Sequence, residues 1–136
     1  MEDLYYFTPD VEASRQNIAR EARRLGYAVR EYDAPVRRPM RIDLNGAYWD
    51  VEYVITADFL EFAFQTADVH VANVGIVRSL CPVRFLSVTF NTATLKTLFE
   101  VLAADMRSSH GLVAFDDTLE TLLSADTLEE GFERYT

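Results

Sequence analysis

The clearest alternation of apolar and polar residues lies between residues 40 and 55. Residues 40–44 and 47–55 each place an apolar side chain at every second position, with mostly charged residues between them. The two runs are separated by Asn45-Gly46, the pair that a two-residue type I′ turn prefers. The pattern predicts a β-hairpin with one apolar and one charged face. Trp49 and Tyr53 belong to the apolar face, so we expect them in the core rather than on a binding platform.

Residues 83–115 show the signals of a strand, a helix and a second strand in succession. Residues 83–90 are rich in β-branched and aromatic side chains, which favours a strand. Residues 94–109 repeat apolar side chains at helical spacing, after a start signal at Asn91 and Thr92. Gly111 is expected to end this helix in the left-handed conformation. Residues 112–115 then have the composition of a short returning strand.

The N-terminal part follows a similar order. Residues 4–7 are aromatic and predict a strand, and residues 27–32 predict another. Between them we expect a helix over residues 9–25, capped by Thr8 and with Pro9 at its first position. The segment 33–39 contains two prolines and two adjacent arginines, Arg37 and Arg38, and is predicted as a loop with a local basic spot.

Two stretches are harder to interpret. Residues 59–64 are too densely apolar to show one period; aromatic content favours a strand, and a helix capped by Thr56 is the alternative. Residues 69–75 also have strand composition. After residue 115, Asp116 or Asp117 is expected to cap a helix containing Leu119, Leu122 and Leu123. A last short helix carrying Leu128 and Phe132 should follow it.

Together these elements predict an α+β fold in a single domain over residues 1–136. We expect a mostly antiparallel sheet built around the Asn45-Gly46 hairpin and the strand at 83–90. The helices at 9–25 and 94–109 should cover its apolar face, because an apolar stripe on a helix is stable only against another apolar surface. The short acidic C-terminal helices should close one edge.

Charge adds a partner class to this picture. The formal net charge is −9, and residues 116–136 contain seven acidic residues and one arginine. Such a field repels phosphate backbones, which disfavours direct nucleic-acid binding, and it attracts basic proteins. An acidic surface that serves only solubility is the alternative interpretation. No apolar run is long enough for a membrane span and no signal peptide is evident, so we expect a cytoplasmic protein that does not enter a membrane.

Sequence motifs for chemistry are lacking. None of the common phosphate-binding, zinc-protease or serine-hydrolase motifs is present, and the single cysteine, Cys81, is expected to be a small buried residue. His70 is expected in a strand, and His110 at the C-terminal end of the main helix, where a cation is favourable. Asp116, Asp117 and Glu120 resemble helix-capping residues more than a metal site. We therefore predict no catalytic residue, metal or cofactor.

The leading hypothesis is a small binding protein that inhibits a basic partner by covering its surface. In composition alone it resembles the immunity proteins that bacteria make against toxins and nucleases, being small, acidic and poor in cysteine. The predicted partner-binding residues are the C-terminal carboxylates: Asp116, Asp117, Glu120, Asp126, Glu129, Glu130 and Glu133.

Two other hypotheses come from different classes of protein. One is a nucleic-acid mimic, of the type carried by phages, that blocks a DNA- or RNA-binding enzyme. The eight arginines in residues 1–41 count against it. The other is a small enzyme or ligand-binding protein that uses His110 with Asp116 or Asp117.

Overall fold

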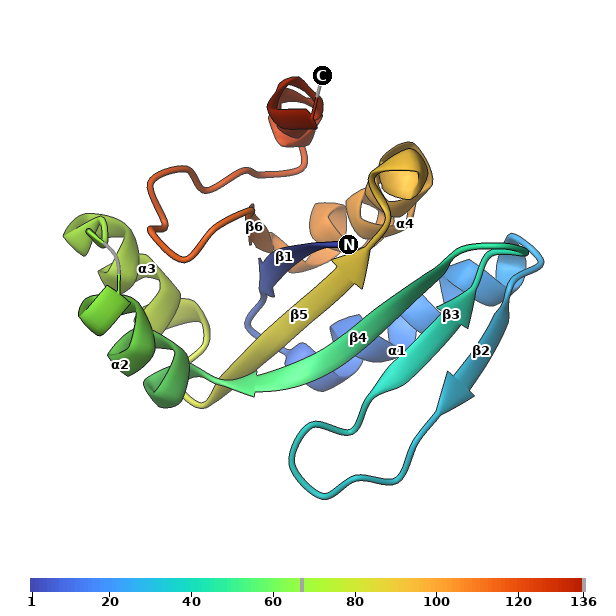
Figure 1. Ribbon diagram of the computed structural model, residues 1–136, viewed down its shortest axis with the longest axis horizontal. Helices are drawn as coiled ribbons and strands as arrows, with labels where there is room; N and C mark the ends of the chain where they lie inside the picture. Colours follow the sequence, from blue (N-terminus) through green and yellow to red (C-terminus); the bar gives the residue numbers. More distant parts are fainter. Residues whose placement is uncertain (67, 136) are drawn as a thin grey trace.

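The computed structural model describes residues 1–66 and 68–135 and is built on one antiparallel sheet (Figure 1). The strands run in the order β2-β3-β4-β5-β1-β6, and each is antiparallel to its neighbours. Their bounds are β1 Glu2–Phe7, β2 Ala28–Glu31, β3 Met40–Asp43, β4 Tyr48–Ile55, β5 Arg84–Phe90 and β6 Leu112–Ala114. The predicted α+β fold is confirmed.

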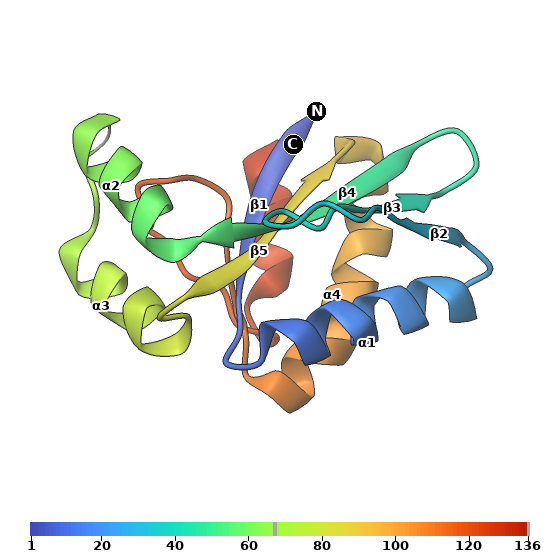
Figure 2. The same ribbon diagram turned by 90° about the horizontal axis from the view of Figure 1, so that it is seen from below.

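One face of the sheet is covered by the two long helices, α1 (Val11–Arg24) and α4 (Leu95–Ser109). Figure 2 shows both on the same side of the strands. A one-turn 3₁₀ helix, η1 (Thr92–Thr94), leads into α4, and the Asn91 side chain caps η1. Strand residues on this face, such as Leu4, Ile42 and Leu86, are completely buried. Both helices therefore pack where the sequence predicts, on the apolar side of the hairpin.

The hairpin itself has the predicted turn. The Leu44 amide donates to the Ala47 carbonyl over 2.8 Å, and Asn45 and Gly46 both have positive φ, at 60° and 120°. This is the type I′ signature. Trp49 and Tyr53 are buried, as predicted. On the charged face, Arg41 and Asp50 are cross-strand partners and form a bidentate pair of 2.8 and 3.1 Å.

The favoured strand at residues 59–64 is wrong, and the helical alternative beginning at Thr56 is correct. The chain forms α2 (Thr56–Thr66) and then α3 (Val71–Leu80), so the strand composition of residues 69–75 is also misleading. Phe59, Leu60 and Ala63 are the buried side of α2. Phe62 and Phe64 are apolar but exposed, which hid the helical period in the sequence.

Helices α2 and α3 cover only one end of the second face of the sheet (Figure 1). Phe59 and Val77 share a second apolar cluster with Phe7 and Phe85, which point away from α1 and α4. Ring contacts of 4.8 Å between Phe7 and Phe85 and 5.1 Å between Phe59 and Phe85 hold this cluster together. The remainder of this face carries polar pairs such as Arg41–Asp50 and stays in contact with water.

Two helix ends differ from prediction. Asp10, not Thr8, caps α1 by accepting from the Ala13 amide at 3.1 Å; the Thr8 hydroxyl is buried against Ser14. His110, not Gly111, ends α4 in the left-handed conformation, with φ of 57°. Gly111 has a different constraint, because a Cβ there would lie 2.5 Å from the Tyr6 ring. Glycine is thus required by close packing and not by φ.

The C-terminal segment is only partly as expected. The predicted helix around Leu119–Leu123 is wrong: Leu119 has φ of 56° and is buried in the second cluster, and Leu123 exchanges two 2.8 Å backbone hydrogen bonds with Val113. Burial of the two leucines therefore outweighs local helix formation. The last predicted helix is present as a 3₁₀ helix, η2 (Leu128–Tyr135). This segment closes the sheet along β6.

A buried carboxylate joins the first face of the sheet to both long helices. The Tyr6 hydroxyl of β1 donates to Asp105 of α4, and the Asn17 side chain of α1 donates to the same carboxylate over 2.8 Å. Asp105 is buried, and the pKa of Tyr6 is raised by burial and by this hydrogen bond. Buried polar groups are costly unless hydrogen-bonded, so these three residues fix how α1, α4 and β1 meet.

We expect Tyr6→Phe to lower the free energy of unfolding by about 1–3 kcal/mol, because Asp105 would stay buried with one donor fewer. Urea unfolding followed by circular dichroism measures this change. Tyr32→Phe removes a hydroxyl from an exposed ring and should change the value by less than about 0.5 kcal/mol. Equal stability of the Tyr6→Phe variant and the unaltered chain would contradict a bracing role for this network.

Candidate functional site

The structure disperses the seven predicted partner-binding carboxylates over the C-terminal segment. Three of them, Asp116, Glu130 and Glu133, border one shallow hollow together with Arg134. Glu129 instead borders a groove between η2 and α4. The other three lie in the segment that joins β6 to η2: Asp117, Glu120 and Asp126. The sequence prediction thus identifies an acidic region and not a single flat acidic face.

Asp116 serves the fold of this segment. Its carboxylate accepts from the amide and hydroxyl of Thr118 and pairs with the Arg134 guanidinium at 2.9 Å. Burial acts to raise the pKa of the Asp116 carboxyl, but the hydrogen bonds from Thr118 and Arg134 outweigh it and leave the pKa lowered. Asp116 is therefore ionised and already engaged, which makes it less available to a partner than its neighbours.

The loop that carries Asp117 and Glu120 is fixed against the start of α3. The His70 amide donates to the Thr118 carbonyl at 2.8 Å, and the Asn73 side-chain amide donates to the Leu119 carbonyl at 2.6 Å. Asn73 lies within residues 69–75, whose composition favours a strand. No sequence signal links it to a loop more than forty residues later. The contact brings predicted site residues next to α3.

The two histidines have capping roles. His70 lies at the N-terminus of α3, where its ring nitrogen Nδ1 faces the Asn73 amide at 3.4 Å, so its predicted place in a strand is wrong. His110 ends α4, as predicted. His110 borders a shallow hollow along α3, whereas Asp116 borders the one beside η2. The geometry therefore does not bring His110 and Asp116 together in one hollow.

Cys81 is a buried thiol that donates to the Thr8 carbonyl at 3.2 Å. Burial raises the pKa of the thiol to about 11, so it is protonated at neutral pH. Since the thiolate is the reactive form, this residue has the structural role predicted from the sequence. Across residues 1–66 and 68–135, no group of three or more His, Cys, Asp or Glu side chains is arranged to hold a metal ion.

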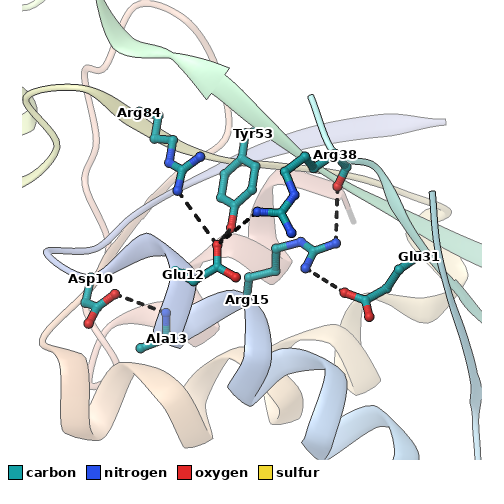
Figure 3. Close-up of polar contacts among 8 residues, drawn as sticks. All are labelled: Asp10, Glu12, Ala13, Arg15, Glu31, Arg38, Tyr53 and Arg84. Atoms are coloured by element: carbon teal, nitrogen blue, oxygen red, sulfur yellow. Dashed lines mark hydrogen bonds and ion pairs between the residues drawn. The ribbon is translucent and has the colours of Figure 1, made fainter. Parts of the chain in front are cut away.

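The densest ionic cluster of the structure surrounds Glu12, in the first turn of α1 (Figure 3). The Tyr53 hydroxyl of β4 donates to the Glu12 carboxylate. Arg38, from the loop after β2, and Arg84, from β5, approach the same oxygen at 3.8 and 3.7 Å. The Arg84 guanidinium also lies 4.0 Å from the centre of the Tyr53 ring. Of the predicted basic spot, Arg38 is thus folded onto α1, whereas Arg37 pairs with Glu52 of β4 at 3.8 Å.

Arg15, three residues after Glu12 in α1, supports this cluster through contacts with the loop and β2. It is only 4% exposed, and it pairs with Glu31 at 2.6 Å while donating to the Arg38 carbonyl at 3.2 Å. The Arg38 backbone is held at φ of 41°, a conformation that non-glycine residues rarely adopt. Three guanidiniums face two carboxylates here, so the region keeps a positive excess within an acidic protein.

The groups in this cluster are poor acids and bases at neutral pH. The hydrogen bond from Tyr53 and the nearby arginines lower the pKa of Glu12 against a smaller effect of burial. Burial and the Glu12 carboxylate raise the pKa of Tyr53 to about 12. Glu12 is therefore ionised and Tyr53 protonated. The arrangement fixes α1, the loop and two strands to one another rather than offering proton transfer.

No protein-family model, curated protein or solved structure matches this chain. Within the described residues, none of the helices combines the length and apolar character needed to cross a membrane. The function must therefore be argued from the residues and geometry of the chain itself.

We expect Glu12→Gln to lower the free energy of unfolding at pH 7 by about 1 kcal/mol, a small value because Glu12 is more than a third exposed to solvent. The folded-state pKa of Glu12 lies below its ordinary value of 4.5, so its contribution is complete above that pH. It should disappear as the pH falls through the lowered pKa. Urea unfolding of both chains at several pH values measures the difference, and a difference that grows on acidification would contradict this assignment.

Proposed function

We propose that this protein is a small cytoplasmic binding protein that inhibits a basic protein partner by covering its surface, as an immunity protein neutralises a toxin. The observation that supports the proposal is the uneven use of charge. Seven arginines, all but one from residues 15–84, form ion pairs within the fold. In contrast, Glu120, Asp126, Glu129 and Glu130 are exposed and form no ion pair with another described residue.

This distribution suits encounter with a positively charged surface. Charges that are not neutralised internally extend a field into solvent, which raises association rates with oppositely charged proteins and makes them sensitive to salt. The positive excess around Glu12 belongs to the sheet and α1, away from the C-terminal segment, so it need not oppose binding there (Figures 1 and 3). Apolar side chains buried at the interface would slow dissociation and so set the lifetime of the complex. The free, buried thiol of Cys81 is compatible with a reducing compartment.

The geometry gives less support to the two alternative functions. A nucleic-acid mimic needs carboxylates in a long regular array, whereas Asp116 is paired with Arg134 and Glu129 borders a different hollow from Glu130. An enzyme that uses His110 with Asp116 needs a shared pocket, and these two residues border separate hollows.

Reversal of three exposed carboxylates tests the proposal. We expect the chain with Glu120→Lys, Asp126→Lys and Glu130→Lys to lose a basic partner that the unaltered chain captures from lysates of the source cell and of its competitors. Asp116 is left unchanged because it holds the segment together. Capture is compared at low and moderate salt, with identification by mass spectrometry, and the captured protein's own activity is assayed with and without this protein.

A matched control separates local from global charge. The variant with Asp33→Lys, Asp43→Lys, Gln16→Lys and Val36→Lys has the same net charge as the test variant and alters exposed residues that border neither hollow of the C-terminal segment. It should retain the partner. The inhibitor proposal fails if no basic protein is captured in a salt-sensitive manner, or if the captured protein keeps its activity in the complex. Loss of the partner from both variants would show that only net charge matters, and would overturn the role given to the C-terminal carboxylates.

A further inference from the structure

The segment between β4 and β5 carries more than half of the exposed large apolar side chains of the described residues. Within the described residues, nine large apolar side chains are exposed, and five of them lie between residues 62 and 83: Phe62, Phe64, Val71, Ile76 and Val83. Phe62 is 59% exposed, Val71 73% and Ile76 43%. Isolated apolar residues on a surface are ordinary, but their concentration on one unit is typical of an interaction site.

Closure of the sheet does not require so long a connection. The two strands are paired up to Ile55 and Arg84, and the Thr56 amide donates to the Val83 carbonyl at 3.0 Å, so a short turn could join them. Instead, α2 and α3 project together from one end of the sheet (Figures 1 and 2). Their inner side covers Phe7 and Phe85. On their outer side, Gly75 and Ile76 of α3 border an open, shallow hollow together with His110 and Leu112.

Exposed carboxylates outnumber cations in this unit and beside the start of α3, whereas His110 borders the hollow along Gly75 and Ile76. Asp58, Glu61 and Asp68 are exposed on α2 and in the connection to α3. The loop that carries Asp117 and Glu120 is fixed to the start of α3 by Asn73, as described above. The one arginine of the unit, Arg78, lies beside the Phe64 ring, with its guanidinium 6.0 Å from the ring centre. An apolar centre with a charged rim is the usual composition of a protein interface.

We propose that the exposed side of α3, with Gly75 near its centre and Val71 and Ile76 on either side, is the docking surface for the basic partner, and that it receives an apolar helix face flanked by Lys or Arg. This inference rests on the proposed function and names the surface that supplies its apolar anchors. The acidic rim argues for the flanking cations by charge complementarity. It excludes an acidic segment of the same shape.

Gly75 supports close approach of a helix to α3. It lies in the middle of α3, is exposed, and a Cβ at this position would meet nothing within 4 Å. Packing inside the chain therefore does not require glycine, although glycine is less favourable than alanine in a helix. A bare backbone at this point leaves room for an incoming side chain beside Ile76. The same open space makes Gly75 a suitable position to block docking without disturbing the fold.

The test uses the full chain and two synthetic helical peptides. Both peptides carry the same apolar stripe, flanked by Lys in one and by Glu in the other. We expect the Lys peptide to shift the backbone amide resonances of residues 71–79 in a ¹⁵N NMR titration, and the Glu peptide to bind about tenfold more weakly or worse. Gly75→Gln should weaken binding of the Lys peptide by about tenfold, equivalent to 1.4 kcal/mol. Gly75→Ala is the matched control and should bind nearly as the unaltered chain does.

The competing outcomes are distinct. Shifts confined to other elements, equal binding of both peptides, or full binding by a folded Gly75→Gln variant would overturn the docking surface. So would a dimer in light scattering that Gly75→Gln dissociates, because the occupant would then be a second copy of this chain.

Failure of this surface can be told apart from failure of the proposed function. Capture of the basic partner by the unaltered chain and equally by Gly75→Gln would overturn the α3 surface while the inhibitor function stands. Peptide shifts on α3 together with lysate capture that finds no salt-sensitive basic partner would support the surface and overturn the function.

Discussion

The need of the antiparallel sheet to bury one whole face determines the arrangement of this protein. Strands with alternating side chains give the sheet one apolar face, which is removed from water only if other elements cover it. Here α1 and α4 cover that face along the length of the sheet. The second face is apolar only near Phe7 and Phe85, so a shorter unit, α2–α3, suffices there. The buried Asp105 carboxylate then fixes the angle at which the long helices meet β1, because its donors come from both Tyr6 and Asn17.

Periodicity in the sequence predicted those parts of the fold whose two sides differ. The hairpin at Asn45-Gly46 and helices α1 and α4 each have one apolar and one polar side, so pattern and structure agree. Residues 56–80 could not be predicted in this way, because Phe62 and Phe64 are apolar without being buried. The predicted helix around Leu119 and Leu123 was wrong for the opposite reason. Their burial depends on neighbours distant in sequence, and this tertiary preference outweighed the local signals for a helix.

The acidic character of the candidate site could be predicted from the sequence, but the contacts that its residues make could not. Counting carboxylates located the acidic region, but nothing in the sequence indicates that Asp116 is paired with Arg134 or that Asn73 fixes residues 119–120 to α3. The basic spot at Arg37 and Arg38 was evident, whereas its carboxylate partners lie on other elements: Glu52 of β4 for Arg37 and Glu12 of α1 for Arg38. Charge composition therefore gives the sign of a surface. Only the fold shows which charges are neutralised internally and which remain for a partner.

The two edges of the sheet are protected in different ways against pairing with a strand of another molecule. Along β6, Leu123 pairs with Val113 through both backbone hydrogen bonds, so that edge is occupied by the chain's own C-terminal segment. At the opposite edge, β2 is only four residues long and carries the exposed charges Arg30 and Glu31. Short, charged edge strands resist addition of further strands. As long as the C-terminal segment stays in place, neither edge of the sheet thus offers a long unpaired strand to a second molecule.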